Sequence, residues 1–594
     1  MGEAARDAVE TTQEKRRDGL WAAVAVLVFA AALATAFLGF WGSDFRESVP
    51  VPSSMLPDDA HPKRQVKPVI EADYRLAVWA VGRNAYALLH EPMRLFQAEP
   101  CHPTRNALAL HHPVIAPAIV AAPAHALTGD PVAAFNAAVL LKIAIGFAAM
   151  VLLVADWTRS PAAGIVAGLL YGFHAIQVEH PYHLFTSDNA WMLFGLYFAR
   201  RLFERGQWID AVGVAVSCLL QMGASFYPFF ASAVTALPLL GWLIWHYGVK
   251  SVPLSRALLV LGIVGAGALL LFAPYLGHEG GELSGRGRVF YAPWSTFLPG
   301  GSNFAGWLGA LLAVAAFALG RRRALAGISG DPRAALVVAA LLVAAFATGG
   351  NHYARVMVLA GGEPPPFALP NPFAALAQVI PGLQVVRLPG EFALAVREIA
   401  CLLAGFGAAA LFRWVPARWV TFAAALLIFA AFAETLRPPF LGLASAPPFG
   451  ALRIRPSDAS LAFFDTLEKK GNRGPLLELP VDRKNRAYTF RHAPMQQLLT
   501  AYHHRRTSGC YVSFIPQRVR GLASISEDLP EPEALDRALE LGFTTIVIHH
   551  DERLPSGREV AEEFQRSASV NDGRLVPIAT SATMTAYELR EPGQ

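Results

Sequence analysis

Long apolar segments separated by short basic clusters constrain this chain more than any other feature. The first segment, Leu20 to Trp41, follows Lys15, Arg16 and Arg17. It exceeds the apolar core of a signal peptide, about 7–15 residues, and is long enough to cross a bilayer as an uncleaved helix. About ten further apolar segments follow. Because only segments with internally bonded backbones are stable in lipid, the pattern predicts an all-α polytopic membrane domain.

The charge content supports the same class. Only 16% of the 594 residues are charged, whereas soluble globular chains carry about a quarter. The net charge of +5 is small for this length and indicates no nucleic-acid partner. We therefore expect the chain to be surrounded by membrane lipids.

The basic clusters predict how the chain crosses the membrane. The segment Val114 to Leu127 is short and contains prolines, so we expect a juxtamembrane or re-entrant helix there. With that segment left out, all clusters between spans fall on one side, which predicts about eleven transmembrane helices. That side is the cytoplasm, and it also holds the N-terminus. The clusters are those at Arg159, Arg200, Arg201, Arg205, Lys250, Arg321, Arg322, Arg323, Arg413 and Arg418.

The chain divides into three parts. We expect a cytoplasmic tail at 1–19, a transmembrane domain at 20–436 with an outer loop at 42–113, and a soluble α/β domain at 437–594 outside the cytoplasm. Strand-like runs in the last part include Pro475 to Leu479 and Thr544 to Ile548. Asp458 to Lys470 and Glu531 to Leu541 are typical of helices.

The outer loop at 42–113 carries the first candidate site residues. Glu71 and Asp73 directly precede an expected amphipathic helix from Tyr74 to Leu89. A carboxylate there can act as a general base, hold a divalent cation, or simply cap the helix. His111 and His112 stand where the loop returns to the bilayer; they can bind phosphate or metal, or be interfacial histidines.

Two later outer loops add candidates. Glu179, His180, His183 and Asp188 lie close together in the second outer loop, and Asp188 can instead cap the next helix. Their spacing matches no known metal-binding pattern, so the cofactor stays undetermined, with a divalent cation as one alternative. Arg387, in a Pro-rich outer loop, can bind an anionic head group because a guanidinium fits phosphate in a bidentate manner.

Inside the bilayer, Lys142, Arg397 and Glu398 are costly charges that usually face a cavity or a partner. Cys101 and Cys510 both fall in segments predicted to be outside the cytoplasm, where a disulfide can form. Nothing in their spacing requires one.

The order of these motifs resembles the GT-C glycosyltransferases, which include the protein O-mannosyltransferases and the aminoarabinose transferase of lipid A. The similar elements are an outer-loop acid at Asp73-Tyr74-Arg75, a basic-Pro element at His112-Pro113 and a second-loop acid at Asp188. The run Val386 to Pro389, followed by an apolar helix, also resembles bacterial members of that superfamily. Two departures are Glu71-Ala72-Asp73 in place of an acidic pair and His112 in place of a lysine.

The resemblance implies an inverting transfer of a sugar from a polyprenyl-phosphate donor to a lipid or glycan acceptor at the outer face of the bacterial cytoplasmic membrane. Asp73, with Glu71 beside it, would deprotonate the acceptor hydroxyl. His112 and Arg387 would bind the leaving phosphate, with His111, His183 and Asp188 nearby. Two alternatives stay open: a non-catalytic envelope-glycan assembly or binding protein, and a transporter or flippase of lipid-linked glycans.

Overall fold

The computed structural model describes most of the chain between residues 3 and 591, with the side chains of α1 described from residue 19 onward. The described part excludes residues 58–61, 63, 175–180, 182–183, 185–188, 277–290, 320–330, 350–370, 380–382, 384–385, 387, 445–446, 472, 482–487, 513–514, 551–561 and 568–572.

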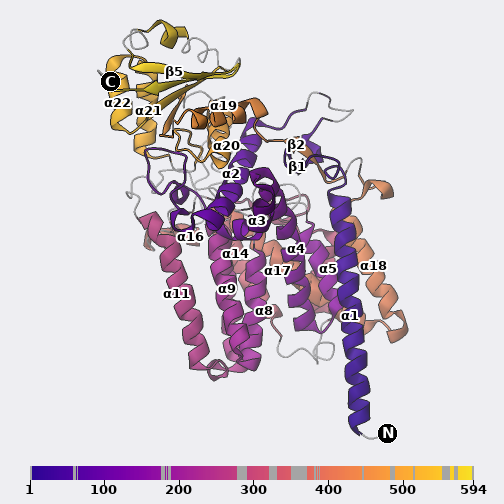
Figure 1. Cartoon of the computed structure of the whole chain (residues 1–594). Helices are drawn as coiled ribbons and strands as arrows, with labels where there is room; N and C mark the ends of the chain where they lie inside the picture. The colour runs from indigo at the N-terminus through magenta and orange to yellow at the C-terminus, as the bar shows by residue number, and fades with distance from the viewer. Residues whose placement is uncertain are drawn as a thin grey trace, which may run out of the picture.

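A bundle of apolar helices forms one part of the molecule (Figure 1). Within the described residues, six helices are long and apolar enough to cross a membrane. They are α1 (Glu3–Ala36, apolar from Gly19), α4 (Pro131–Thr158), α10 (Phe226–Tyr247), α11 (Leu254–Leu276), α17 (Ala393–Trp414, with the preceding turn from Pro389) and α18 (Ala417–Leu436).

The other predicted spans also coincide with helices, which are shorter in the described part of the chain. They are α5 (Pro161–Gly172), α8 (Ala190–Arg205), α9 (Trp208–Ala224), α13 (Trp307–Ala318) and α14 (Arg333–Ala347). The predicted class, an all-α polytopic membrane domain with a C-terminal α/β part, is therefore confirmed.

Two helices that lie between α1 and α4 in the sequence are found at the end of the bundle nearest the sheets (Figure 1). They are α2 (Pro68–His90) and α3 (Ile115–Thr128), which pack on each other and on α4. Pro123 lies inside α3, and Gly129 ends it with a left-handed backbone (φ +64°), so the helix stops after 14 residues. α2 begins at Pro68 and not near Tyr74 as predicted, because proline fits the first turn of a helix.

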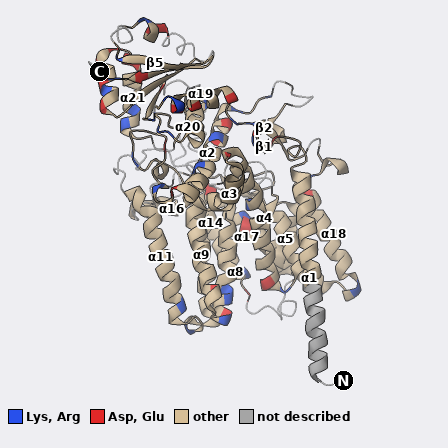
Figure 2. Cartoon of the chain, viewed as in Figure 1, with Lys and Arg blue, Asp and Glu red and all other residues tan. Residues whose placement is uncertain are grey.

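Charged residues are concentrated at the ends of the bundle helices and in the outer part (Figure 2). At the end opposite the sheet, the guanidinium of Arg200 pairs with Asp156, and that of Arg201 donates 2.9 Å to Asp210. Asp210 is fully buried, and Arg200 is nearly so. These pairs neutralise charge where α4, α8 and α9 meet.

Two sheets form the outer part. β1 (Ser48–Pro52), from the first loop, pairs antiparallel with β2 (Phe449–Arg453), which follows the last span. The second sheet has the order β3-β4-β6-β5, with β3 and β4 parallel and the other pairs antiparallel. Its strands are β3 (Leu476–Leu479), β4 (Thr545–His549), β5 (Leu575–Thr580) and β6 (Met584–Leu589).

Helices that accompany the second sheet in the described part of the chain are α19 (Asp458–Lys469), α20 (Ala493–His503), α21 (Gln517–Asp528) and α22 (Pro532–Glu540). The side chain of Ser457 caps α19 by accepting a hydrogen bond from the amide of Ser460. α20 follows a single π-helical turn, Tyr488–His492, and packs on α2. The C-terminal part is thus seated on the helix that carries the first candidate acids.

The first outer loop and the C-terminal part hold each other in several places. Cys101 and Cys510 form a disulfide across a sequence separation of 409. The amide of Cys101 donates 3.0 Å to the carbonyl of Gly509, and the ring of Tyr86 stacks on that of His504.

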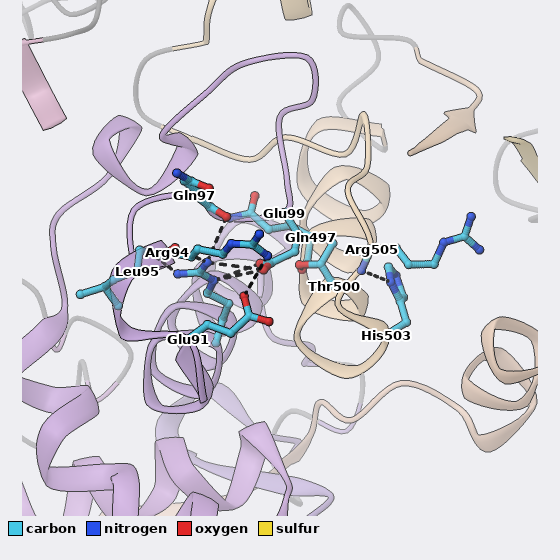
Figure 3. Close-up of polar contacts among 10 residues, drawn as sticks. Glu91, Arg94, Leu95, Gln97, Glu99, Gln497, Thr500, His503 and Arg505 are labelled. Carbon is cyan, nitrogen blue, oxygen red and sulfur yellow. Dashed lines mark hydrogen bonds and ion pairs between the residues drawn. The ribbon is translucent and has the colours of Figure 1, made fainter. Parts of the chain in front are cut away.

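A buried guanidinium organises the segment of the first loop that faces α20. Arg83 pairs with Glu99 at 3.0 Å and donates to the carbonyls of Arg94, Leu95 and Gln97. Figure 3 shows these loop residues converging beside Gln497 and Thr500 of α20. One cation thereby satisfies several carbonyls of a segment with little regular structure.

Candidate functional site

Asp73 lies in the second turn of α2 and is half-buried, so it does not cap the helix. Its Oδ1 accepts a hydrogen bond of 2.9 Å from the phenol of Tyr511. Burial, together with the Asp73 carboxylate, raises the pKa of the Tyr511 phenol, so the phenol keeps its proton and donates. A residue from the C-terminal part therefore orients the predicted base.

Tyr511 also connects Asp73 to the first of the two histidines. The Nε2 of His111 donates 3.1 Å to the backbone carbonyl of Tyr511, and the indole of Trp79 packs beside the imidazole at 5.6 Å. Burial lowers the pKa of His111 to about 4, and the hydrogen bond to Tyr511 opposes that shift only in part. His111 is thus neutral at neutral pH and serves as a hydrogen-bond donor within the protein.

His112 faces the neighbouring helices of the bundle. Its Nδ1 lies 3.0 Å from the hydroxyl of Ser225, the residue that precedes α10. The rings of Phe226 and Tyr227 lie 5.7 and 4.6 Å from its own. The phenol of Tyr275, near the end of α11, donates 2.9 Å to the His111 carbonyl. The ends of α10 and α11 thus fix the His111-His112 segment.

Glu71 does not share this arrangement. It forms an ion pair with Arg75, one turn further along α2, and both side chains line a separate cavity toward the C-terminal sheet. Residues two apart on a helix point to nearly opposite sides, so Glu71 and Asp73 face different surroundings. The two acids predicted to act together are therefore separated by the helix that carries them.

Three predicted site residues, His183, Asp188 and Arg387, lie outside the described residues. Their described neighbours are informative. Val386 is buried in one apolar cluster with Tyr227, whose ring contacts His112. Val386 therefore lies in the same apolar cluster as the start of α10, which contacts His112.

Arg397 and Glu398, two of the predicted intramembrane charges, belong to a buried polar group on α17. Glu398 accepts a hydrogen bond of 2.7 Å from the amide of Asn189, and Arg397 contacts the imidazole of His174 at 3.2 Å. Arg397 and Glu398 are both fully buried. This group ties α17 to the segments flanking residues 175–188.

The described residues contain no group of three or more His, Cys, Asp or Glu side chains that could hold a metal ion. The Glu179, His180, His183 and Asp188 group lies outside them.

Sequence reasoning missed Tyr511, Ser225 and Tyr275. Tyr511 directly follows Cys510, so the disulfide to Cys101 was the one signal that could have placed it beside the first loop. The other two carry no sequence pattern that distinguishes them from ordinary residues at helix ends.

The sequence matches no protein-family profile and no curated protein. The structure resembles that of the arabinofuranosyltransferase AftD from Mycobacteria, with a TM-score of 0.50 and 14% identity over 96% of this chain and 40% of that one. It also matches ArnT from Cupriavidus metallidurans bound to undecaprenyl phosphate, with a TM-score of 0.45 and 13% identity over 96% and 97% of the two chains.

At this level of identity, the similarity to AftD identifies the fold. The chain is a membrane protein with the GT-C glycosyltransferase fold, as the order of its motifs predicted.

Proposed function

We propose that the protein transfers a sugar from a polyprenyl-phosphate donor to a lipid or glycan acceptor at the outer face of the bacterial cytoplasmic membrane. The observation that carries this proposal is the position of Asp73. Asp73 belongs to α2, which packs both on α4 of the bundle and on α20 of the outer part, and the phenol of Tyr511 orients its carboxylate. The glycosyltransferase fold and the resemblance of the motifs support the same reaction class.

In the proposed reaction, Asp73 takes the proton of the acceptor hydroxyl as that oxygen attacks the anomeric carbon. The bond from this carbon to the phosphate oxygen breaks with its electron pair, and the phosphate remains on the polyprenyl chain. A single displacement of this kind inverts the anomeric configuration. General-base catalysis of this sort contributes about 10²–10⁴ in rate.

The leaving phosphate carries negative charge that needs hydrogen-bond donors or cations. We assign this role to His112 and Arg387, because the apolar cluster around Tyr227 brings their two segments together. His111 is assigned to positioning, since its imidazole is neutral and donates to the backbone of Tyr511. Asp188 and His183, which belong to the second outer loop in the sequence, are proposed to contact the donor, as the motif resemblance implies.

The orientation follows from charge. The basic clusters at the end of the bundle opposite the sheet are proposed to lie in the cytoplasm, which places 437–594 in the periplasm (Figure 2). The polyprenyl chain would then lie among the apolar helices with its phosphate at the level of α2 and α3.

The test uses the full-length protein in proteoliposomes with a panel of undecaprenyl-phosphate sugars as donors and a bacterial glycolipid extract as acceptor, and it measures the acceptor-dependent release of undecaprenyl phosphate. Asp73→Asn keeps the shape of the side chain and removes the base, so we expect a loss of at least about 100-fold. Glu71→Gln, on the other face of α2, is the matched control and should keep most of the activity. If Asp73→Asn turned over at the wild-type rate, Asp73 would not be the base.

Two further readouts separate the alternatives. Activity abolished by a chelator and restored by a divalent cation would assign Asp73 to metal binding. Movement of the intact lipid-linked sugar between leaflets, without release of undecaprenyl phosphate, would support a flippase.

A further inference from the structure

A cavity lies in the outer part, on the face of α2 away from Asp73. Its volume is about 850 Å³, which is within the usual range for small-molecule sites. It is bounded by α2, by the loop before it, by the π-helical turn that leads into α20, and by the ends of β4 and β6.

Basic side chains dominate the polar lining of this cavity. They are Arg64, Arg75, Arg491, His492, His549 and His550. Glu71 is the one carboxylate among the described lining residues, and its charge is already engaged by Arg75. Glu478 lies behind His549, fully buried, and accepts hydrogen bonds from that histidine at 2.7 Å and from Thr507. The cavity therefore retains an excess of positive charge from its arginines.

Arg75 and Arg491 form the centre of this charge. The guanidinium of Arg75 donates to the backbone carbonyl of Arg491 at 3.3 Å and pairs with Glu71. Burial lowers the pKa of Arg75, the charge of Glu71 opposes this shift, and the nearby charge of Arg491 adds to it. Among the described residues, no carboxylate pairs with the Arg491 side chain. Two like charges beside one cavity, with one carboxylate between them, favour a bound anion.

We propose that this cavity binds an anionic group, a carboxylate or a phosphate, on the acceptor glycan. This inference rests on the proposed function, because that function puts a glycan acceptor at this face of the membrane. Arg491 is the main contact and Arg75 supports it. The histidines of the lining, His492, His549 and His550, add polar groups for sugar hydroxyls.

The geometry of α2 sets a minimum size for such an acceptor. Arg75 and Asp73 are two residues apart on opposite faces of one helix, whose diameter with side chains is about 10 Å. An acceptor that places its anion at Arg75 and its reacting hydroxyl at Asp73 therefore contains more than one sugar unit.

The experiment measures binding to the full-length protein in lipid nanodiscs by calorimetry at low salt. The probes are trigalacturonate, glucose 1-phosphate and the neutral trisaccharide maltotriose. We expect at least one charged probe to bind, with maltotriose much weaker. Trigalacturonate alone assigns a carboxylate and glucose 1-phosphate alone assigns a phosphate; binding of both also supports the proposal.

Arg491→Ala should weaken binding of the charged probe about tenfold or more, because a charge-assisted contact is lost. Arg473→Ala removes a highly exposed arginine of the same part of the chain and should bind like wild type. Arg491→Gln, which keeps a polar stem, replaces the alanine variant if the latter unfolds.

Absence of binding by both charged probes, equal binding of maltotriose, or unchanged binding in the Arg491 variants would overturn the proposal. Asp73→Asn distinguishes this result from the proposed function, because it should lose transfer and keep binding. Binding that persists when Asp73→Asn remains active would support the cavity and reject the base.

Discussion

The phenol of Tyr511 donates a hydrogen bond of 2.9 Å to the carboxylate of Asp73, which lies 438 positions earlier in the chain. Asp73 belongs to the first outer loop and Tyr511 to the C-terminal part. The C-terminal part therefore contributes directly to the candidate active site.

Tyr511→Phe removes the donor and leaves the ring in place. A hydrogen bond to a charged group contributes about 1.5–3 kcal/mol, so we expect kcat/KM for undecaprenyl-phosphate sugar to fall about 10- to 100-fold. The variant should unfold at the same temperature as wild type to within a few degrees. Unaltered turnover would mean that Tyr511 does not orient the base.

The disulfide fixes the residue next to Tyr511 to the first loop. Replacing both Cys101 and Cys510 with serine removes a crosslink between residues 409 positions apart, and such a loss typically costs about 2–5 kcal/mol. We expect a lower unfolding temperature together with reduced transfer activity. Cys218→Ser, at a free and half-buried cysteine, should change neither quantity. Equal stability of the double variant and wild type would contradict this expectation.

The neutral His111 predicts a pH dependence of stability. Its pKa is lowered from 6.5 to about 4 in the folded protein, so the unfolded chain binds a proton between these values that the folded chain does not. Stability is therefore complete above pH 6.5 and falls as the pH decreases toward 4. His102, with a pKa also lowered to about 4 by burial and by Arg506, contributes in the same direction.

His111→Gln tests the first of these contributions. Glutamine can keep the donor toward the Tyr511 carbonyl but cannot take up a proton in this range. The unfolding temperature of the variant should decrease less than that of wild type between pH 6.5 and 4. Parallel curves for the two proteins would show that His111 is not the titrating group.

Gly407 allows α17 to lie directly against α13. A Cβ atom at this position would overlap the backbone carbonyl of Leu312. Small residues permit this close approach of helices in membranes, so we expect Gly407→Ala to destabilise the protein by a few kcal/mol. Gly262→Ala is the control, since a Cβ there meets nothing within 4 Å. The two variants are heated in detergent, and the fraction of protein that stays monodisperse is measured as a function of temperature.

The helical spans were predictable because hydropathy and basic clusters are local properties of the sequence. Asp458–Lys469 and Leu476–Leu479 show that the same holds for elements of the outer part. The start of α2 was wrong by about two turns, because the acids at Glu71 and Asp73 were taken as the beginning of the helix and Pro68 was overlooked.

Only the part of the candidate site that comes from the first outer loop was predictable from the sequence. The motif order indicated Asp73 and His112, but no local signal separates Glu71 from Asp73. The difference arises from packing: α20 and its preceding turn cover one face of α2, while Tyr511 reaches the other. Contacts over several hundred residues depend on tertiary structure and leave no periodic trace in the sequence.

The bridge from Cys101 to Cys510 has a consequence for biogenesis. Tyr511 is translated after all the membrane helices. The hydrogen bond that orients Asp73 therefore cannot form while those helices are being inserted. Under the proposed function, full transfer activity would follow only after the last segment has folded against the first loop and the disulfide has formed.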